Sequence, residues 1–112
     1  MRIFITGGSG FIGSHLVPKL EKGGHKLLLL EHRPSFKNPF STSIKFIKGD
    51  LSQIDSLKNK IKKFRPDAII HLAWEGIPDF SAEKSSRNLL CSLNLINLAR
   101  ELKCKKFLSV GS

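Results

Sequence analysis

Three glycines near the N-terminus carry the clearest chemical signal in the sequence. Gly7, Gly10 and Gly13 lie three residues apart, directly after a short β-branched and aromatic run and directly before an apolar helical repeat. At such a junction the first glycine permits a tight turn, the second lets a ligand approach the backbone, and the third lets the helix pack closely on the strand. Free amide groups at the helix start, at Phe11 and Ile12, favour an anion. The spacing therefore predicts a loop that binds a pyrophosphate.

An acidic residue follows at the distance that suits a dinucleotide. Glu31 lies 18 positions after Gly13, at the end of the second predicted strand. A carboxylate there accepts hydrogen bonds from the adenosine ribose and repels a 2′-phosphate, which favours NAD. Arg33 could instead reach a 2′-phosphate, so NADP stays open as an alternative cofactor.

Strands and helices that could position these groups alternate along the chain. Short apolar runs predict strands, and apolar residues about four positions apart predict helices. The predicted strands are Arg2–Thr6, Lys26–Glu31, Ile44–Lys48, Ala68–Ala73 and Lys105–Val110. The predicted helices run from Phe11 to the glycines at 23 and 24, from Ser52 to about Phe64, and from about Ser81 to Leu102. This alternation predicts an α/β fold, a doubly wound parallel sheet of about five strands in the order 3-2-1-4-5. The last strand is expected to be a bare edge, which leaves the sheet incomplete at its C-terminal end.

Two local features of the helices can be tested. Ile12, Leu16 and Leu20 predict the buried face of the first helix, in which Pro18 should bend or loosen the backbone. Ser52 is the predicted N-cap of the second helix.

Composition narrows the class of protein. A chain of 112 residues has room for one domain. The net charge of +10 could indicate a polyanionic partner. The densest cluster of cations lies along one predicted helix without interleaved aromatic residues, which is typical of a solvated face, so no nucleic acid is expected.

No segment resembles a membrane span or a signal peptide, so a cytoplasmic protein is expected. Cys91 and Cys104 fit no metal motif and are expected to be packing residues.

The motifs together resemble the extended short-chain dehydrogenase/reductases, the NAD(P)-dependent epimerase/dehydratase family. The run Thr-Gly-Gly-Ser-Gly-Phe-Ile-Gly at residues 6–13 is similar to the cofactor motif of that family. The similarity continues at Gly49-Asp50-Leu51, at His71-Leu72-Ala73, at Asn88 and at Gly111-Ser112. It covers essentially the whole chain and implies a Rossmann-like fold.

The resemblance assigns roles to several of these residues. It implies that Asp50 binds the adenine amino group and that Leu51 contributes a backbone amide, although Asp50 could instead be a helix-start acid. It implies that Leu72 and Ala73 line the cofactor and that Asn88 is a structural residue beside it. His71 is expected to be a packed strand-end residue rather than a proton carrier.

Two further roles depend on the substrate side of the site. Trp74 stands where the family has a small residue, and it could either wall the nicotinamide or sugar pocket or be a loop aromatic. Ser112 aligns with the catalytic Ser/Thr that hydrogen-bonds the reacting oxygen of the substrate.

The resemblance implies an enzyme that oxidises a hydroxyl of a nucleotide sugar by hydride transfer to a nicotinamide. That chemistry also uses a Tyr-x-x-x-Lys acid/base pair, and the sequence contains no tyrosine. Residues 1–112 are therefore expected to be the N-terminal, NAD(P)-binding part of such an enzyme, without its substrate domain and inactive alone. A non-catalytic dinucleotide-binding or sensor module is the alternative. The family also implies a homodimer through the helix at Ser81–Leu102, whose apolar residues are equally compatible with simple burial.

Overall fold

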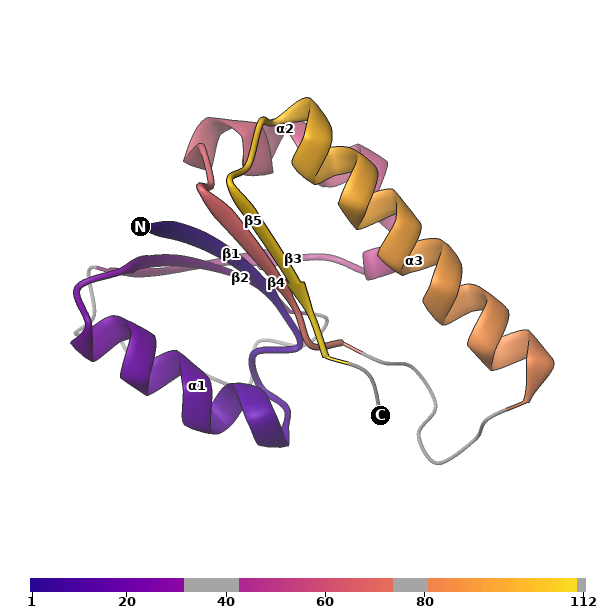
Figure 1. The fold of residues 1–112 in the computed structure, drawn as a ribbon, viewed down its shortest axis with the longest axis horizontal. Coiled ribbons are helices and arrows are strands. Elements are labelled where there is room, and N and C mark those ends of the chain that lie inside the picture. Colours follow the sequence, from indigo (N-terminus) through magenta and orange to yellow (C-terminus); the bar gives the residue numbers. More distant parts are fainter. Residues whose placement is uncertain (32–42, 74–80, 111–112) are drawn as a thin grey trace.

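A computed structural model describes residues 1–31, 43–73 and 81–110, which form one parallel sheet with helices on both faces (Figure 1). The strands are β1 (Arg2–Thr6), β2 (Lys26–Glu31), β3 (Ile44–Lys48), β4 (Ala68–His71) and β5 (Lys106–Ser109). The helices are α1 (Phe11–Lys22), the 3₁₀ turn η1 (Leu51–Gln53), α2 (Ile54–Phe64) and α3 (Ala82–Glu101). The strand order is β3-β2-β1-β4-β5 and every pairing is parallel, which confirms the predicted doubly wound, Rossmann-like fold.

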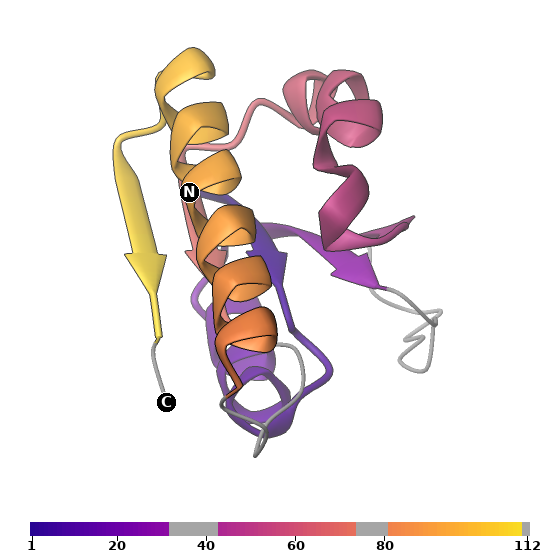
Figure 2. The same ribbon diagram turned by 90° about the vertical axis from the view of Figure 1, so that its right-hand side faces the viewer.

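The sheet separates two hydrophobic clusters. On one face α1 packs on alternate strand residues such as Ile5, Leu27 and Leu29. On the other face α2 and α3 pack on the residues between them, including Phe4 and Leu28. Figure 2 shows α3 lying along the sheet between β5 and α2. β2 is buried from both sides, as its four consecutive leucines predict for a central parallel strand.

The two sides of β5 are poorly covered. This strand is the last in the sheet order, and its Leu108 side chain is 58% exposed. Phe107, on the opposite face of the strand, packs partly against the cluster beneath α3. The prediction of a bare fifth strand is confirmed for the part of the chain that the structure describes.

The buried face of α1 is centred one position later than predicted. Gly13 and Val17 are buried, whereas Ile12 is 47% exposed, so the assignment of Ile12 to the buried face is wrong. Gly13 packs against the preceding loop, where a Cβ atom would lie 2.4 Å from the Gly8 carbonyl oxygen, so the buried face passes through Gly13 and not through Ile12. The other two predicted positions, Leu16 and Leu20, are partly buried against the cluster on this face of the sheet. Pro18 lies within α1 at an exposed position and does not end the helix.

The predicted N-cap at Ser52 is also wrong. A carboxylate oxygen of Asp50 accepts a hydrogen bond from the Ser52 backbone amide at 3.0 Å, which starts the 3₁₀ turn, and α2 begins only at Ile54. Asp commonly bonds the backbone two residues ahead, and here this turn competes with a direct helix start.

Candidate functional site

The predicted ligand-binding groups meet at the carboxyl edge of the sheet. Gly7 follows β1, Glu31 ends β2, Gly49 follows β3 and Leu72 follows β4. Backbone hydrogen bonds join neighbouring members: Gly49 donates to the Glu31 carbonyl at 3.1 Å, and Leu72 donates to the Thr6 carbonyl at 2.9 Å. In the strand order, β2 and β3 are added on one side of β1, and β4 and β5 are added on its other side. Ligands of doubly wound folds bind at such a reversal point.

Two of the loop glycines are required by the fold itself. Gly7 has a φ of +74°, and a Cβ atom there would lie 2.5 Å from the Ala73 backbone nitrogen. A Cβ atom at Gly13 would lie 2.4 Å from the Gly8 carbonyl oxygen. Both contacts are with backbone atoms, which cannot swing aside as the end of a side chain can. These glycines hold the loop against β4 and the helix against the loop.

Gly10 is different, because nothing inside the protein requires it. Its φ of −74° and ψ of −176° are open to any residue. A Cβ atom there would meet only the Gly7 carbonyl oxygen, at an ordinary contact distance of 3.4 Å. Gly10 is exposed. Because Gly10 has no side chain, its backbone is accessible from the solvent. Close approach of a ligand to the backbone requires such access.

The start of α1 is open to an anion. Gly10 occupies the N-cap position without a capping side chain, and the first turn carries no acidic residue. The amides of the first helical turn and the positive end of the helix dipole are thus left for a negative group. Phe11, 82% exposed, and Ile12 flank this point, and the Phe11 ring lies edge-on to the His15 ring with centroids 5.1 Å apart.

Glu31 is a buried acid with an unused acceptor. Its residue is 4% exposed, and among the described residues no hydrogen-bond partner reaches its buried Oε1 atom. Burial raises the pKa of the Glu31 carboxyl above its ordinary value, and a hydrogen bond with the Ser9 side chain opposes that rise. A buried acceptor without a partner is costly. A hydroxyl donor from a bound ribose would satisfy Oε1, so this residue fits the predicted cofactor.

Thr6 and His71 form a buried polar pair beneath the same edge. The Thr6 Oγ1 and His71 Nδ1 atoms are 2.6 Å apart, and the Ala73 amide donates to Thr6 Oγ1 at 3.4 Å. Both side chains are 1% exposed, and burial lowers the pKa of the His71 imidazole. His71 is therefore neutral near pH 7, which supports the expectation that it is a packed strand-end residue.

The adenine side of the site is less sharply defined. Asp50 lies at the predicted edge, one residue after Gly49, but it is exposed and its carboxylate accepts from Ser52. That contact is the helix-start role named as the alternative, and adenine binding by Asp50 stays a prediction. Leu51 is partly buried against the cluster beneath α2. Asn88 is 5% exposed within the second turn of α3.

Three predicted site residues lie outside the described part of the chain: Arg33, Trp74 and Ser112. Two residues of the site were not predicted: Thr6, which hydrogen-bonds His71, and Ser9, whose side chain opposes the rise in the pKa of Glu31. Both belong to the glycine motif, but the motif pattern alone does not say which strand-end side chain each one meets.

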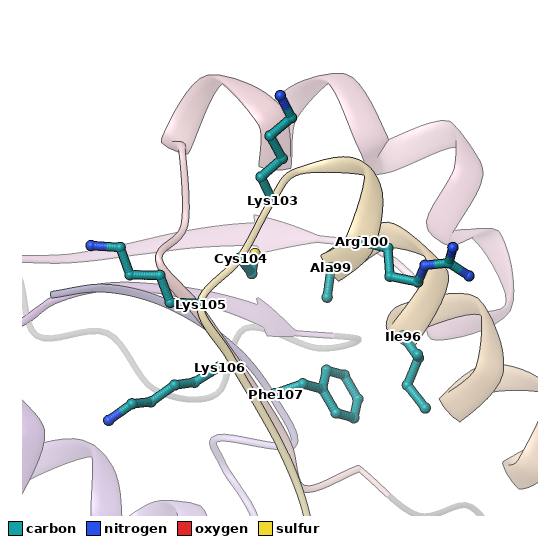
Figure 3. A pocket seen from close by; sticks show the side chains of 8 residues that line it. All are labelled: Ile96, Ala99, Arg100, Lys103, Cys104, Lys105, Lys106 and Phe107. Atoms are coloured by element: carbon teal, nitrogen blue, oxygen red, sulfur yellow. The ribbon is translucent and has the colours of Figure 1, made fainter.

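A shallow pocket elsewhere does not coincide with this site. It lies between the last turn of α3 and the start of β5, at the opposite edge of the sheet, and contains none of the predicted ligand-binding residues (Figure 3). Its cationic side chains, Arg100, Lys103, Lys105 and Lys106, point in different directions in Figure 3 and do not converge on a common point.

Residues 1–31, 43–73 and 81–110 hold no group of three His, Cys, Asp or Glu side chains that could bind a metal ion. No helix in those ranges has the length and apolar character needed to cross a membrane.

The fold and the glycine loop define a Rossmann-like α/β domain. The model of the NAD dependent epimerase/dehydratase family matches residues 3–112, and the chain belongs to this family.

Individual relatives agree with this assignment. The chain is 32% identical to the UDP-glucose 4-epimerase GEPI42 of Cyamopsis tetragonoloba, in an alignment that covers 98% of the chain and 36% of the relative. It is also 32% identical to the dTDP-D-glucose 4,6-dehydratase of Dictyostelium discoideum, over 99% of the chain and 29% of the relative. The chain thus spans about a third of the length of these relatives.

Solved structures resemble the same fold. The Bordetella bronchiseptica enzyme WbmG in complex with NAD and UDP superposes with a TM-score of 0.79 at 29% identity, covering 97% of this chain and 36% of that one. The UDP-glucose 4-epimerase of Thermus thermophilus in complex with NAD gives a TM-score of 0.77 at 29% identity, with coverages of 96% and 36%.

Proposed function

We propose that this chain binds NAD at the carboxyl edge of its sheet and is the cofactor-binding part of a nucleotide-sugar epimerase, dehydratase or reductase. The observation that carries the proposal is Gly10, a glycine that neither backbone conformation nor internal packing requires. The unpaired Oε1 atom of Glu31 supports it. So do relatives whose structures contain NAD and UDP.

Each part of the edge has a separate role in this proposal. The amides of Phe11 and Ile12 bind the pyrophosphate at the start of α1, and Glu31 accepts a hydrogen bond from the adenosine ribose. Asp50 and Leu51 bind the adenine. Leu72, Ala73 and Asn88 line the cofactor, and Trp74 walls the nicotinamide or sugar pocket. Arg33 would reach the 2′-phosphate if NADP were the cofactor.

Bound NAD would supply the hydride acceptor for oxidation of a sugar hydroxyl. In this chain Ser112 would hydrogen-bond the reacting oxygen. The family's tyrosine acid/base is not among the 112 residues, so we propose that these residues alone bind the cofactor without turnover. Epimerisation of UDP-glucose by the purified 112-residue chain would contradict this part of the proposal.

The Gly10→Val substitution tests the loop directly. The valine side chain occupies the space in front of the loop, so NADH binding should weaken by at least about a hundredfold, or about 2.8 kcal/mol, while the fold is kept. Calorimetric titration with NADH measures the loss. The matched control is Gly23→Val at the other end of α1, where φ is an ordinary −73° and the nearest contact is the flexible His25 side chain. Unchanged NADH affinity in Gly10→Val would refute the assignment of the loop.

The Glu31→Ala substitution tests the choice of cofactor. A carboxylate in this position accepts from a ribose hydroxyl and repels a 2′-phosphate, so NADH should bind more tightly than NADPH. Removing the carboxylate should reduce the ratio of the NADPH and NADH dissociation constants by about tenfold, the worth of about one charged hydrogen bond. If the ratio does not change, Glu31 is not the ribose ligand.

A non-catalytic dinucleotide-binding or sensor module is the second candidate, and it rests on the same glycine loop and the same Glu31 carboxylate. The two candidates share the NADH site and differ in whether the full-length protein that carries these residues turns over a nucleotide sugar. Turnover of UDP-glucose by that full-length protein favours the enzyme, and NADH binding by it without turnover favours the sensor module. A homodimer through α3 belongs to the first candidate.

A further inference from the structure

Three hydrogen-bonded groups link the ends of β1 and β4 beneath the proposed NAD site. The Thr6 Oγ1 atom lies 2.6 Å from the His71 Nδ1 atom, and it accepts a hydrogen bond from the Ala73 amide at 3.4 Å. Thr6 and His71 stand opposite each other in the register of the two strands. The Thr6 hydroxyl therefore joins a titratable side chain to a backbone group that the proposed function places against the cofactor.

The Ala73 amide is also a close neighbour of the glycine loop. A Cβ atom at Gly7 would lie 2.5 Å from the Ala73 nitrogen, so the loop and the segment after β4 meet at this amide. A backbone bond fixes the residue before it, since Leu72 donates to the Thr6 carbonyl at 2.9 Å. The position of Ala73 against the loop thus depends on the end of β1, through the backbone of Thr6 and through its hydroxyl.

The two bonds of Thr6 indicate which nitrogen of His71 carries the proton. Because the Ala73 amide is the donor in its bond with Oγ1, the Thr6 hydroxyl proton is free to donate to Nδ1. The proton of the neutral imidazole then lies on Nε2. With that proton on Nδ1 instead, the Thr6 hydroxyl would have to turn its own proton away from the contact, at a side chain that is 1% exposed.

The second nitrogen of His71 shows that the imidazole is a poor choice for stability alone. The Nε2 atom is buried and has no hydrogen-bond partner among the described residues. A buried polar atom without a partner lowers the free energy of unfolding. The three residues before His71 in β4 are buried and apolar, and an apolar side chain would suit this place as well. What the imidazole adds is the acceptor at Nδ1.

We propose that His71 positions the cofactor edge: its neutral imidazole accepts a hydrogen bond from the Thr6 hydroxyl and so orients that hydroxyl to hold the Ala73 amide against the glycine loop. His71 is a positioning residue that acts through Thr6. This inference rests on the proposed function and deepens it, because it makes NAD binding depend on the charge of a side chain beneath the site.

Protonation of His71 would disrupt this arrangement. An imidazolium carries a proton on both nitrogens, so Nδ1 no longer accepts and the Thr6 hydroxyl has to turn. Burial lowers the pKa of the His71 imidazole below its ordinary value of about 6.5. The neutral form therefore prevails above about pH 6.5, and the arrangement is lost as the pH falls through the lowered pKa.

The groups around His71 come from the neighbouring strands and from the helices on the same face. Its register partners on β1 and β5, Thr6 and Ser109, carry no charge. The buried residues of α2 are apolar. Glu31 ends β2 on the opposite face, because Leu29, two positions before it, packs on the α1 side. The first two turns of α3 contain the buried Asn88 and the charged residues Glu83, Lys84 and Arg87.

The experiment compares His71→Asn with His71→Leu in the 112-residue chain. Asn places an oxygen near the position of Nδ1 and does not titrate, whereas Leu has no acceptor. NADH dissociation constants are measured by calorimetry between about pH 5 and 8, a range that spans the titration of a histidine with a lowered pKa. His25→Asn is the matched control, because it removes a histidine just before β2, at the amino edge of the sheet. Proton–nitrogen NMR correlation spectra identify the tautomer of His71 directly.

We expect His71→Leu to weaken NADH binding about tenfold at neutral pH, the worth of about one hydrogen bond. His71→Asn should stay within about twofold of the wild type there. On acidification the wild type should lose more affinity than His71→Asn, in which the Glu31 carboxyl still titrates but residue 71 does not. His25→Asn should keep the wild-type profile, and the spectra should show the His71 proton on Nε2.

Four results overturn the inference while the proposed function stands. A His71→Asn protein with the wild-type pH profile would show that His71 does not control the site. A His71→Asn protein that binds NADH as weakly as His71→Leu would exclude the acceptor as the cause. A His71→Leu protein with wild-type affinity, or a His71 proton on Nδ1, would exclude the bond from Thr6. If the wild-type chain itself does not bind NADH, the proposed function fails, and the positioning role fails with it.

Discussion

Single residues of the glycine loop fall into two physical kinds. Gly7 and Gly13 face backbone atoms of their own chain at distances that exclude a Cβ atom, whereas a Cβ atom at Gly10 would meet only the Gly7 carbonyl oxygen, at 3.4 Å. The first kind contributes to folding and the second leaves room for a ligand. The three glycines of one motif should therefore respond differently to the same substitution.

Gly13→Ala should destabilise the fold. The new Cβ atom would lie 2.4 Å from the Gly8 carbonyl oxygen and 2.6 Å from the Gly7 carbonyl oxygen. We expect a loss of about 1–3 kcal/mol in the free energy of unfolding, as for other overpacked sites, seen as a lower midpoint in urea. Gly10→Ala is the control and should change stability by less than about 0.5 kcal/mol. Equal midpoints for the two variants would contradict this account of the loop.

The residue scale also shows what the sequence could and could not predict. The spacing of the glycines and the position of Glu31 are local patterns, and the structure brings these residues to one edge as expected. The hydrogen bond between Thr6 and His71 joins residues far apart in the chain. It depends on the register of β1 against β4, which no local pattern specifies.

At the scale of elements, the strands were easier to predict than the helix starts. Residues Leu27 to Leu30 are consecutive leucines, so they point to both faces of the sheet. In a doubly wound sheet such a run fits a strand that is buried on both faces. The start of α2 depends instead on competition between two nearby polar side chains. Asp50 bonds the Ser52 amide and inserts a 3₁₀ turn, so the helix begins two residues after the predicted cap.

Pro18→Ala should stabilise α1. Pro18 is exposed inside the helix and has no N–H group to donate to the Ser14 carbonyl. Restoring that donor removes a cost of about 3 kcal/mol, less the roughly 1 kcal/mol by which proline restricts the unfolded chain. We expect a net gain of about 1–2 kcal/mol in a urea titration, with NADH affinity unchanged. The control is Lys19→Ala, at the next exposed position. If Pro18→Ala is no more stable than this control, the proline does not lower the free energy of unfolding of the chain.

The whole molecule distributes its exposed apolar surface unevenly. Leu89 and Leu90 are 59% exposed and Leu93 is 48% exposed, all on the outer side of α3. Leu95 and Leu98 of the same helix are buried, so the apolar run of this helix is explained only in part by burial within the chain. Leu108 forms a second exposed site on β5, at 58%. A soluble domain seldom leaves neighbouring leucines this open without a partner surface.

We expect the chain to self-associate through the outer side of α3. Leu89 and Leu93 are four residues apart and share one helical face, and each leucine buried in a contact contributes about 1.5–3 kcal/mol. The double substitution Leu89→Lys and Leu93→Lys should therefore shift the chain to monomer in sedimentation experiments. Leu108→Lys is the matched control, because it adds the same kind of charge on β5. Since each copy carries a net charge of +10, salt should strengthen association by screening the repulsion between copies. A monomeric wild-type chain at high salt, or a dimer that survives the double substitution in α3, would exclude α3 as the contact.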